Sequence, residues 1–171
     1  QAVKTEGNAL VQAGTWLESS VVDKTELIRR AKEAKEKIHL GDLLSIASIK
    51  HFENGPAQWK HKGRICFRGD NVKDEYGAVA VFQELTASPT AIHSANANMA
   101  YGSLPGHCST VSDAIRAYIQ SLLKSKHRTW VHMPSELQPA EWKGKCTTPM
   151  CLLERALYGH PASGAHWEKH L

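Results

Sequence analysis

The sequence predicts an α+β fold that mixes helices with short antiparallel strands. Apolar side chains recur at helical spacing between residues 24 and 37, which is typical of an amphipathic helix. After this segment, the turn-forming residues Asn54-Gly55-Pro56 separate two short apolar segments and so indicate a β-hairpin. The chain has 171 residues, 42% of them hydrophobic, which is enough for one domain, or a domain and a half, with a sizeable core.

Two helices are predicted near the N-terminus. Residues 2–13 carry apolar side chains on one helical face, and Gly14 ends this helix. Trp16 is expected in an extended turn, and the second helix covers residues 24–37 before Gly41 ends it. The second helix is supported by a capping-box pattern at Asp23 and Glu26 and by the i,i+4 pairs Glu26–Arg30 and Glu33–Lys37.

The central segment is predicted to contain the hairpin and a third helix. Residues 43–49 and 64–67 form its two strands, and the lysine and arginine residues around them make it a basic hairpin. Residues 78–82 fit either a strand or a buried helix. Ser88-Pro89 is typical of a helix start, so a helix is expected over residues 90–101, where small side chains suit close packing.

The last third of the chain is predicted to alternate short strands with irregular segments. Strands are expected at residues 109–113, 130–133 and 150–157, an irregular connection at 134–144, a turn at 158–161 and a final helix at 162–171. No internal repeat or low-complexity tract occurs.

Composition and motifs exclude several protein classes. No apolar segment approaches the roughly 18 residues that a membrane-spanning helix needs, and no secretory signal or other targeting segment is visible, so an intracellular protein, cytoplasmic or nuclear, is expected. The four cysteines show no pairing pattern, which favours a reducing compartment, and their spacing does not indicate a zinc site. The common nucleotide-binding, zinc-protease and serine-hydrolase motifs are absent.

Positive charge is concentrated in one part of the chain. The formal net charge is +4, but residues 24–73 contain twelve lysines and arginines against six acidic residues. Such a segment could bind a polyanion or could be an ordinary solvated surface.

One acidic residue is a candidate for chemistry. Asp113 ends a predicted strand, and Tyr118 follows five residues later in the sequence Asp-Ala-Ile-Arg-Ala-Tyr. An aspartate in this position commonly caps a helix or forms a turn. Its functional interpretation therefore depends on the rest of the chain.

Five segments, in order along the chain, resemble the reverse transcriptase of copia-type retrotransposons. They are the helix that ends in Gly14-Thr15-Trp16, the segment 62–69 (KGRICFRG), the segment 113–120 (DAIRAYIQ), the segment 130–134 (WVHMP) and the segment 155–159 (RALYG) followed by Ala165, Trp167 and Leu171. The resemblance implies a right-hand polymerase, with residues 1–108 mainly in the fingers and residues 109–171 in the first part of the palm. A chain that starts at Gln1, without an initiator methionine, is expected to be one piece of a longer polyprotein.

The resemblance also implies roles for individual residues. Asp113 resembles the first catalytic aspartate, which helps to hold the two Mg²⁺ ions of nucleotidyl transfer. Ala114 and Tyr118 correspond to nucleotide-binding positions, and Tyr118 to the steric gate beneath the incoming sugar, although a tyrosine packed in a helical core fits the residue equally well. The second pair of catalytic aspartates is expected beyond Leu171, so the metal site in this chain is incomplete.

The basic residues of the second strand are the remaining candidates. Lys62, Arg64 and Arg68 fall on one face of a regular strand, with Ile65 and Phe67 on the other. By the resemblance, these three side chains contact phosphates of the dNTP or of the RNA or DNA template-primer, and guanidinium groups bind phosphate through charge-assisted bonds. The alternative is a solvated strand face.

Two departures from the family pattern bear on activity. Ala162-Ser163-Gly164 replaces the Gln-Ala-Pro that follows the "LYG" turn, and the helical segment 24–37 replaces a turn-rich one. The expected function is thus the RNA-directed DNA polymerase segment of a copia-like polyprotein, inactive in isolation. Two alternatives are a captured fragment that serves as a non-catalytic structural or interaction subunit with other proteins, and a basic RNA-binding module.

Overall fold

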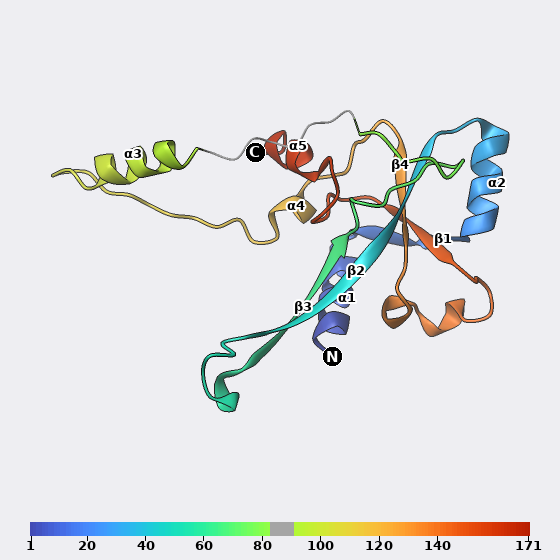
Figure 1. Cartoon of the computed structure of the whole chain (residues 1–171), viewed down its shortest axis with the longest axis horizontal. Coiled ribbons are helices and arrows are strands. Elements are labelled where there is room, and N and C mark those ends of the chain that lie inside the picture. Colours follow the sequence, from blue (N-terminus) through green and yellow to red (C-terminus); the bar gives the residue numbers. More distant parts are fainter. Residues whose placement is uncertain (83–90) are drawn as a thin grey trace.

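The computed structural model describes residues 1–82 and 91–171 and has an α+β fold (Figure 1). The helices are α1 (Ala2–Gln12), α2 (Lys24–Ala34), α3 (Ile92–Gly102), α4 (Ala117–Gln120) and α5 (Ser163–Glu168), and the strands are β1 (Trp16–Asp23), β2 (Ile38–Lys50), β3 (Lys60–Phe67), β4 (Arg128–His132) and β5 (Pro149–Leu153). Short 3-10 turns lie at Pro56–Gln58, Ser135–Leu137 and Ala140–Trp142. Within the described ranges, no helix combines the length and the hydrophobicity needed to cross a bilayer.

All five strands form one mixed sheet in the order β1-β5-β4-β2-β3. Three of the four pairings are antiparallel, as predicted, but β2 and β4 run parallel. A parallel pair needs a long connection between its strands, and here the whole segment from residue 51 to residue 127 joins β2 to β4. The sheet therefore draws its strands from both of the parts that the sequence separates at residue 108.

The two faces of the sheet carry two separate apolar clusters, because successive side chains of a strand point to opposite faces. The first cluster joins α2 to one face and consists of Leu27, Ala31, Ile38, Leu40 and Met150. The second cluster joins α1 to the other face and includes Leu10, Trp16, Leu43, Ile65, Phe67, Val131, Cys151 and Leu153. The helices α1 and α2 thus cover opposite sides of the sheet.

Asp23 fixes the start of α2. Its carboxylate accepts hydrogen bonds from the backbone N–H of Thr25 (3.0 Å), as an N-cap does, and from the N–H groups of Thr147 (2.9 Å) and Thr148 (3.0 Å). These bonds, that from Thr148 most of all, hold the pKa of Asp23 below its ordinary value. One aspartate therefore caps the helix and also ties its start to the segment that leads into β5.

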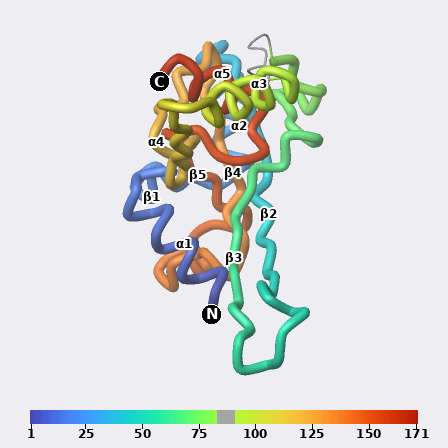
Figure 2. Tube along the Cα trace, turned by 90° about the vertical axis from the view of Figure 1, so that its left-hand side faces the viewer, coloured from blue at the N-terminus to red at the C-terminus, as the bar shows by residue number. Residues whose placement is uncertain are grey.

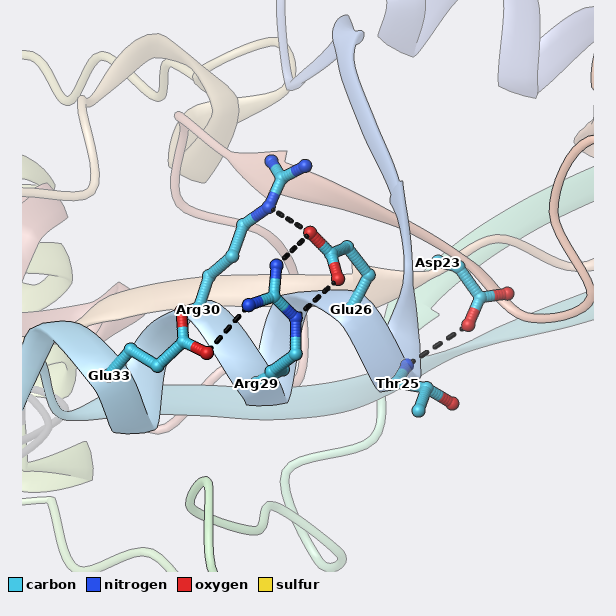
Figure 3. A network of polar contacts seen from close by, with 6 residues as sticks. All are labelled: Asp23, Thr25, Glu26, Arg29, Arg30 and Glu33. Atoms are coloured by element: carbon cyan, nitrogen blue, oxygen red, sulfur yellow. Dashed lines mark hydrogen bonds and ion pairs between the residues drawn. The ribbon is translucent and has the colours of Figure 1, made fainter.

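Of the two ion pairs predicted along α2, Glu26–Arg30 is confirmed and Glu33–Lys37 is wrong (Figure 3). Glu26 binds both Arg29 (2.8 Å) and Arg30 (2.6 Å), so it does not complete the predicted capping box. Glu33 pairs with Arg29 at 2.6 Å instead of with Lys37. Lys37 is out of reach because Lys35 adopts a left-handed conformation (φ 53°) that ends the helix three residues before the predicted boundary.

Gly41 lies in the middle of β2 and does not end a helix, which corrects the sequence-based expectation. The strand begins at Ile38, and the ring of Phe67 occupies the space where a side chain at position 41 would lie. Phe67 is 3% exposed and packs against the His160 ring, so it has little freedom to move away. The glycine is needed here for close packing.

The other predicted elements have mixed outcomes. The structure confirms the first helix, the hairpin, the strand near residues 130–133 and the irregular connection at 134–144. Two elements are shorter than predicted, the strand at 150–157 and the helix at 162–171. The extended turn at Trp16 is an eight-residue strand, residues 78–82 form neither strand nor helix, and residues 109–113 form no strand. Ser88-Pro89 lies outside the described residues, and α3 buries none of its residues, so the expected close packing of this helix is wrong.

We predict that Gly41→Ala lowers the free energy of unfolding by about 1–3 kcal/mol, because the added methyl group overlaps the fixed Phe67 ring. Gly55→Ala is the matched control, since no atom lies within 4 Å of a side chain added at that position, and it should change stability by less than about 0.5 kcal/mol. Urea unfolding of the two variants checks the prediction. Equal stability of both would show that Phe67 can repack.

Candidate nucleic-acid interface

Four basic side chains share one face of the β2–β3 hairpin. The register pairs Lys50 with Lys60, Ser48 with Lys62 and Ile46 with Arg64. Residues directly opposite each other in an antiparallel pair point to the same side, and every second residue of a strand does so too. Lys50, Lys60, Lys62 and Arg64 therefore form one cationic surface, which we call the basic face.

No helix of the described residues covers the basic face. It continues the sheet face on which α2 packs, but α2 contacts only the first residues of β2, Ile38 and Leu40. Further along β2 on the same face, Leu44 is 47% and Ile46 40% exposed. Figure 2 shows β2 and β3 running away from the rest of the sheet to a projecting tip.

The cations of the basic face repel one another. Lys50 and Arg64, in that order of effect, lower the pKa of Lys62 below its ordinary value, and Glu6 acts in the opposite direction. Among the described residues, no ion pair joins any of the four to a carboxylate, whereas Arg29 and Arg30 of α2 are fully paired. Like charges directly opposite each other destabilise a sheet, so this hairpin carries an electrostatic cost that an anion would remove.

Arg68 lies outside the regular strand on which it was predicted to share a face with Lys62 and Arg64. It lies just beyond the end of β3, where its guanidinium pairs with Asp70 at 3.0 Å and its backbone N–H donates to the carbonyl of Asp42. The predicted alternation holds only while the strand is regular, and β3 ends at Phe67. Lys62 and Arg64 are in the predicted place.

Asp113 and Ala114 are exposed and lie in a segment without regular structure. Among residues 1–82 and 91–171, no group of three or more His, Cys, Asp or Glu side chains could hold a metal ion. Asp113 therefore belongs to no such group among the described residues.

Tyr118, by contrast, packs on Tyr158, in the turn of segment 155–159, which also resembles the polymerase family. Its half-buried ring meets that of Tyr158 edge to face, with 4.8 Å between the ring centroids. Arg155 strengthens this contact, because its Nη1 donates to the carbonyl oxygens of Ile119 and Gln120, both at 3.2 Å. Segments 113–120 and 155–159 are thus held together by rings and by hydrogen bonds.

The end of β3 also meets the turn of segment 155–159. We call the place where segments 113–120 and 155–159 and the end of β3 meet the junction. The N–H of Phe67 donates to the carbonyl of Tyr158 at 2.7 Å, and Gly159 (φ 88°) packs against the carbonyl of Phe67. A side chain at position 159 would be strained by this φ and would collide with that backbone. Beside the junction is a surface cleft of about 540 Å³, lined by Leu44, Phe67, Arg68, Gly69, Asp70, Gly159 and Pro161.

The buried His160 packs against Phe67 at the junction. It is 3% exposed, its Nδ1 accepts a hydrogen bond from the N–H of Ala162 (3.2 Å), and its Nε2 lies 3.3 Å from Thr129 Oγ1. Burial, then the nearby His39 and His166, lowers the pKa of His160 to about 3. The ring is therefore neutral at physiological pH and donates its Nε2 proton to Thr129.

Sequence reasoning missed part of this interface. It did not include Lys50 and Lys60, although counting outward from the Asn54-Gly55-Pro56 turn would have placed them opposite each other. It also missed the junction around Tyr158, because no local pattern reveals that Tyr118 packs on a residue 40 positions later.

We predict that stability falls as the pH is lowered from 6.5 towards 3. The folded pKa of His160 is about 3 and its ordinary value is 6.5, so in this window the unfolded chain binds a proton that the folded chain does not. Within this window the free energy of unfolding falls by up to roughly 1.4 kcal/mol for each pH unit. The stability that the neutral His160 contributes is fully present above pH 6.5.

Urea unfolding at several pH values checks this prediction. His160→Gln should reduce the pH dependence across the window, while His61→Gln, at an exposed position of β3, should leave it unchanged. Identical pH dependence in the parent and in His160→Gln would contradict it.

Comparisons of the chain with protein-family models, with curated protein sequences and with solved structures found no match. No relative therefore assigns a role to the basic face or to the junction.

Proposed function

We propose that this chain binds nucleic-acid phosphates through the basic face of its β2–β3 hairpin, as the fingers and first part of the palm of a copia-like reverse transcriptase. The observation that carries the proposal is the set of four cations on one exposed hairpin face, with no carboxylate paired to any of them among the described residues. The ligands would be the template and primer strands.

A polyanion suits this surface for a physical reason. A phosphate beside Lys62 replaces repulsion from Lys50 and Arg64 with attraction, and it also releases the counterions that nucleic acid carries. The surface reads the backbone and not the bases, since lysine and arginine contacts to phosphate position a duplex without specifying its sequence.

The polymerase part of the proposal is supported by the junction. Three segments that resemble the polymerase family are remote in sequence but adjacent in space. They are residues 62–69, 113–120 and 155–159. The cleft beside them, which includes Arg68, is the candidate place for the triphosphate of a dNTP. Polymerisation would need Mg²⁺ held by carboxylates in addition to Asp113, because two-metal nucleotidyl transfer needs several of them.

We predict that Lys60→Gln/Lys62→Gln/Arg64→Gln weakens binding to a primed template and flattens its salt dependence. Each phosphate neutralised contributes about 0.7–0.9 to the log–log slope, so three lost contacts should reduce it by roughly two to three units. Fluorescence anisotropy with a labelled primed template over a series of salt concentrations measures the slope.

The matched control is Arg29→Gln/Arg30→Gln/Arg128→Gln, which removes the same number of positive charges from residues that are already paired with Glu26, Glu33 and Glu36. Its slope should remain close to that of the parent. Equal slopes for the parent and the basic-face variant would reject the phosphate role and favour a non-catalytic interaction subunit. Thermal melts establish that all variants are folded.

We also predict that the 171-residue chain binds a primed template but does not extend the primer in Mg²⁺, because Asp113 alone cannot hold two metal ions in register. Asp113→Asn should bind the template as well as the parent, since Asp113 is separate from the basic face. A primer-extension assay with gel analysis is the measurement. Primer extension by the parent chain would overturn the assignment of an incomplete metal site.

A further inference from the structure

The tip of the β2–β3 hairpin carries two aromatic rings in contact with each other. The Phe52 and Trp59 rings stack, with 5.3 Å between their centroids and 25° between their planes. Phe52 is 66% exposed and Trp59 is only partly buried, so the pair presents aromatic surface to water. The tip lies beyond the last strand pair, Lys50–Lys60, at the far end of the basic face.

Hydrogen bonds hold Trp59 and the backbone of the tip in place, and Phe52 packs on the Trp59 ring. Trp59 Nε1 donates to the carbonyl of Asn54 at 3.0 Å, and Asn54 Nδ2 donates to Gln58 Oε1 at 2.9 Å. The tip backbone closes on itself through the N–H of Asn54, which donates to the carbonyl of His51. The rings are therefore positioned before any ligand arrives, which lowers the entropic cost of binding on them.

The charges around the tip favour one kind of ligand. Residues 50–64 contain four cations, Lys50, Lys60, Lys62 and Arg64, and a single carboxylate, Glu53, which faces His51 at 3.9 Å. An aromatic pair at the end of a row of cations matches a strand of nucleic acid whose bases are free to stack and whose phosphates are close by. A purely apolar partner would leave the cations without counter-charge.

We propose that the Phe52–Trp59 pair is a stacking platform for an unpaired base of a single strand whose phosphates lie along the basic face. This inference rests on the proposed nucleic-acid binding and narrows it to a class of substrate. Bases inside a duplex are already stacked on their neighbours, whereas an unpaired base gains a partner at the tip. The hairpin accordingly prefers single-stranded to double-stranded nucleic acid.

The test compares Phe52→Leu with Phe52→Tyr. Leucine keeps an apolar contact with Trp59 but removes the aromatic face, and tyrosine retains it. Anisotropy titrations use a mixed-sequence oligonucleotide as single-stranded RNA, as single-stranded DNA and as the DNA duplex. Tyr101→Leu is the matched control because Tyr101, on α3, is 63% exposed and remote in sequence from the hairpin.

Phe52→Leu should weaken single-strand binding about tenfold, in keeping with the loss of base–aromatic stacking, and should change duplex binding by less than about twofold. The loss should be the same for RNA and DNA, since both offer the same base faces. Phe52→Tyr should bind like the parent, Tyr101→Leu should have no effect, and the salt slope should not change in any of the three.

An equal loss for single strand and duplex, a loss with only one of RNA and DNA, or no loss at all would overturn the platform and leave the pair as a closure of the hairpin. These outcomes leave the proposed function standing if the basic-face variant still flattens the salt slope. Binding that depends on Phe52 but whose salt slope does not depend on the basic face would reject the proposed function and, with it, the placement of the phosphates along the basic face, and would leave only the stacking of a base on Phe52. Absence of binding to every oligonucleotide would reject both.

Discussion

The continuity of β2 is the constraint on which the rest of the structure depends. At roughly 3.4 Å per residue, its 13 residues extend about 44 Å. The first part, Ile38–Asp42, pairs with β4 and lies in the body of the sheet, and the second part, Leu43–Lys50, pairs with β3. Because β4 accompanies only the first part, the second part and β3 leave the sheet as a two-stranded arm (Figure 1).

An arm of two strands needs support, since an isolated hairpin is marginal in water. Among the described residues, the support comes from one side only: α1 packs on the face that includes Gly63 and Ile65, and at Gly63 the backbone of Ala2 approaches so closely that no side chain would fit. The opposite face is left to water and carries the cations. The asymmetry explains how the hairpin combines a supported stem with an exposed cationic surface.

The other end of β3 is tied down by a different set of contacts. Phe67 lies over Gly41, against His160 and in a hydrogen bond with Tyr158, so the strand end, the centre of β2 and the turn at residues 158–161 form one unit. The buried His160, whose pKa burial lowers to about 3, is part of this unit.

The sequence by itself determined the features that depend on neighbouring residues. The periodicity of residues 2–13, the Asp23 cap, the hairpin turn at Asn54-Gly55-Pro56 and the alternation that puts Lys62 and Arg64 on one face are all local, so each could be predicted.

The tertiary structure decided where those patterns end and which remote segments they contact. Gly41, a helix breaker by local preference, is part of a strand because Phe67 needs the space, and residues 109–113 form no strand because no described strand pairs with them. The parallel β2–β4 pairing and the Tyr118–Tyr158 contact also join distant residues. Packing and hydrogen bonding between remote segments determine such features, and no window of sequence contains both partners.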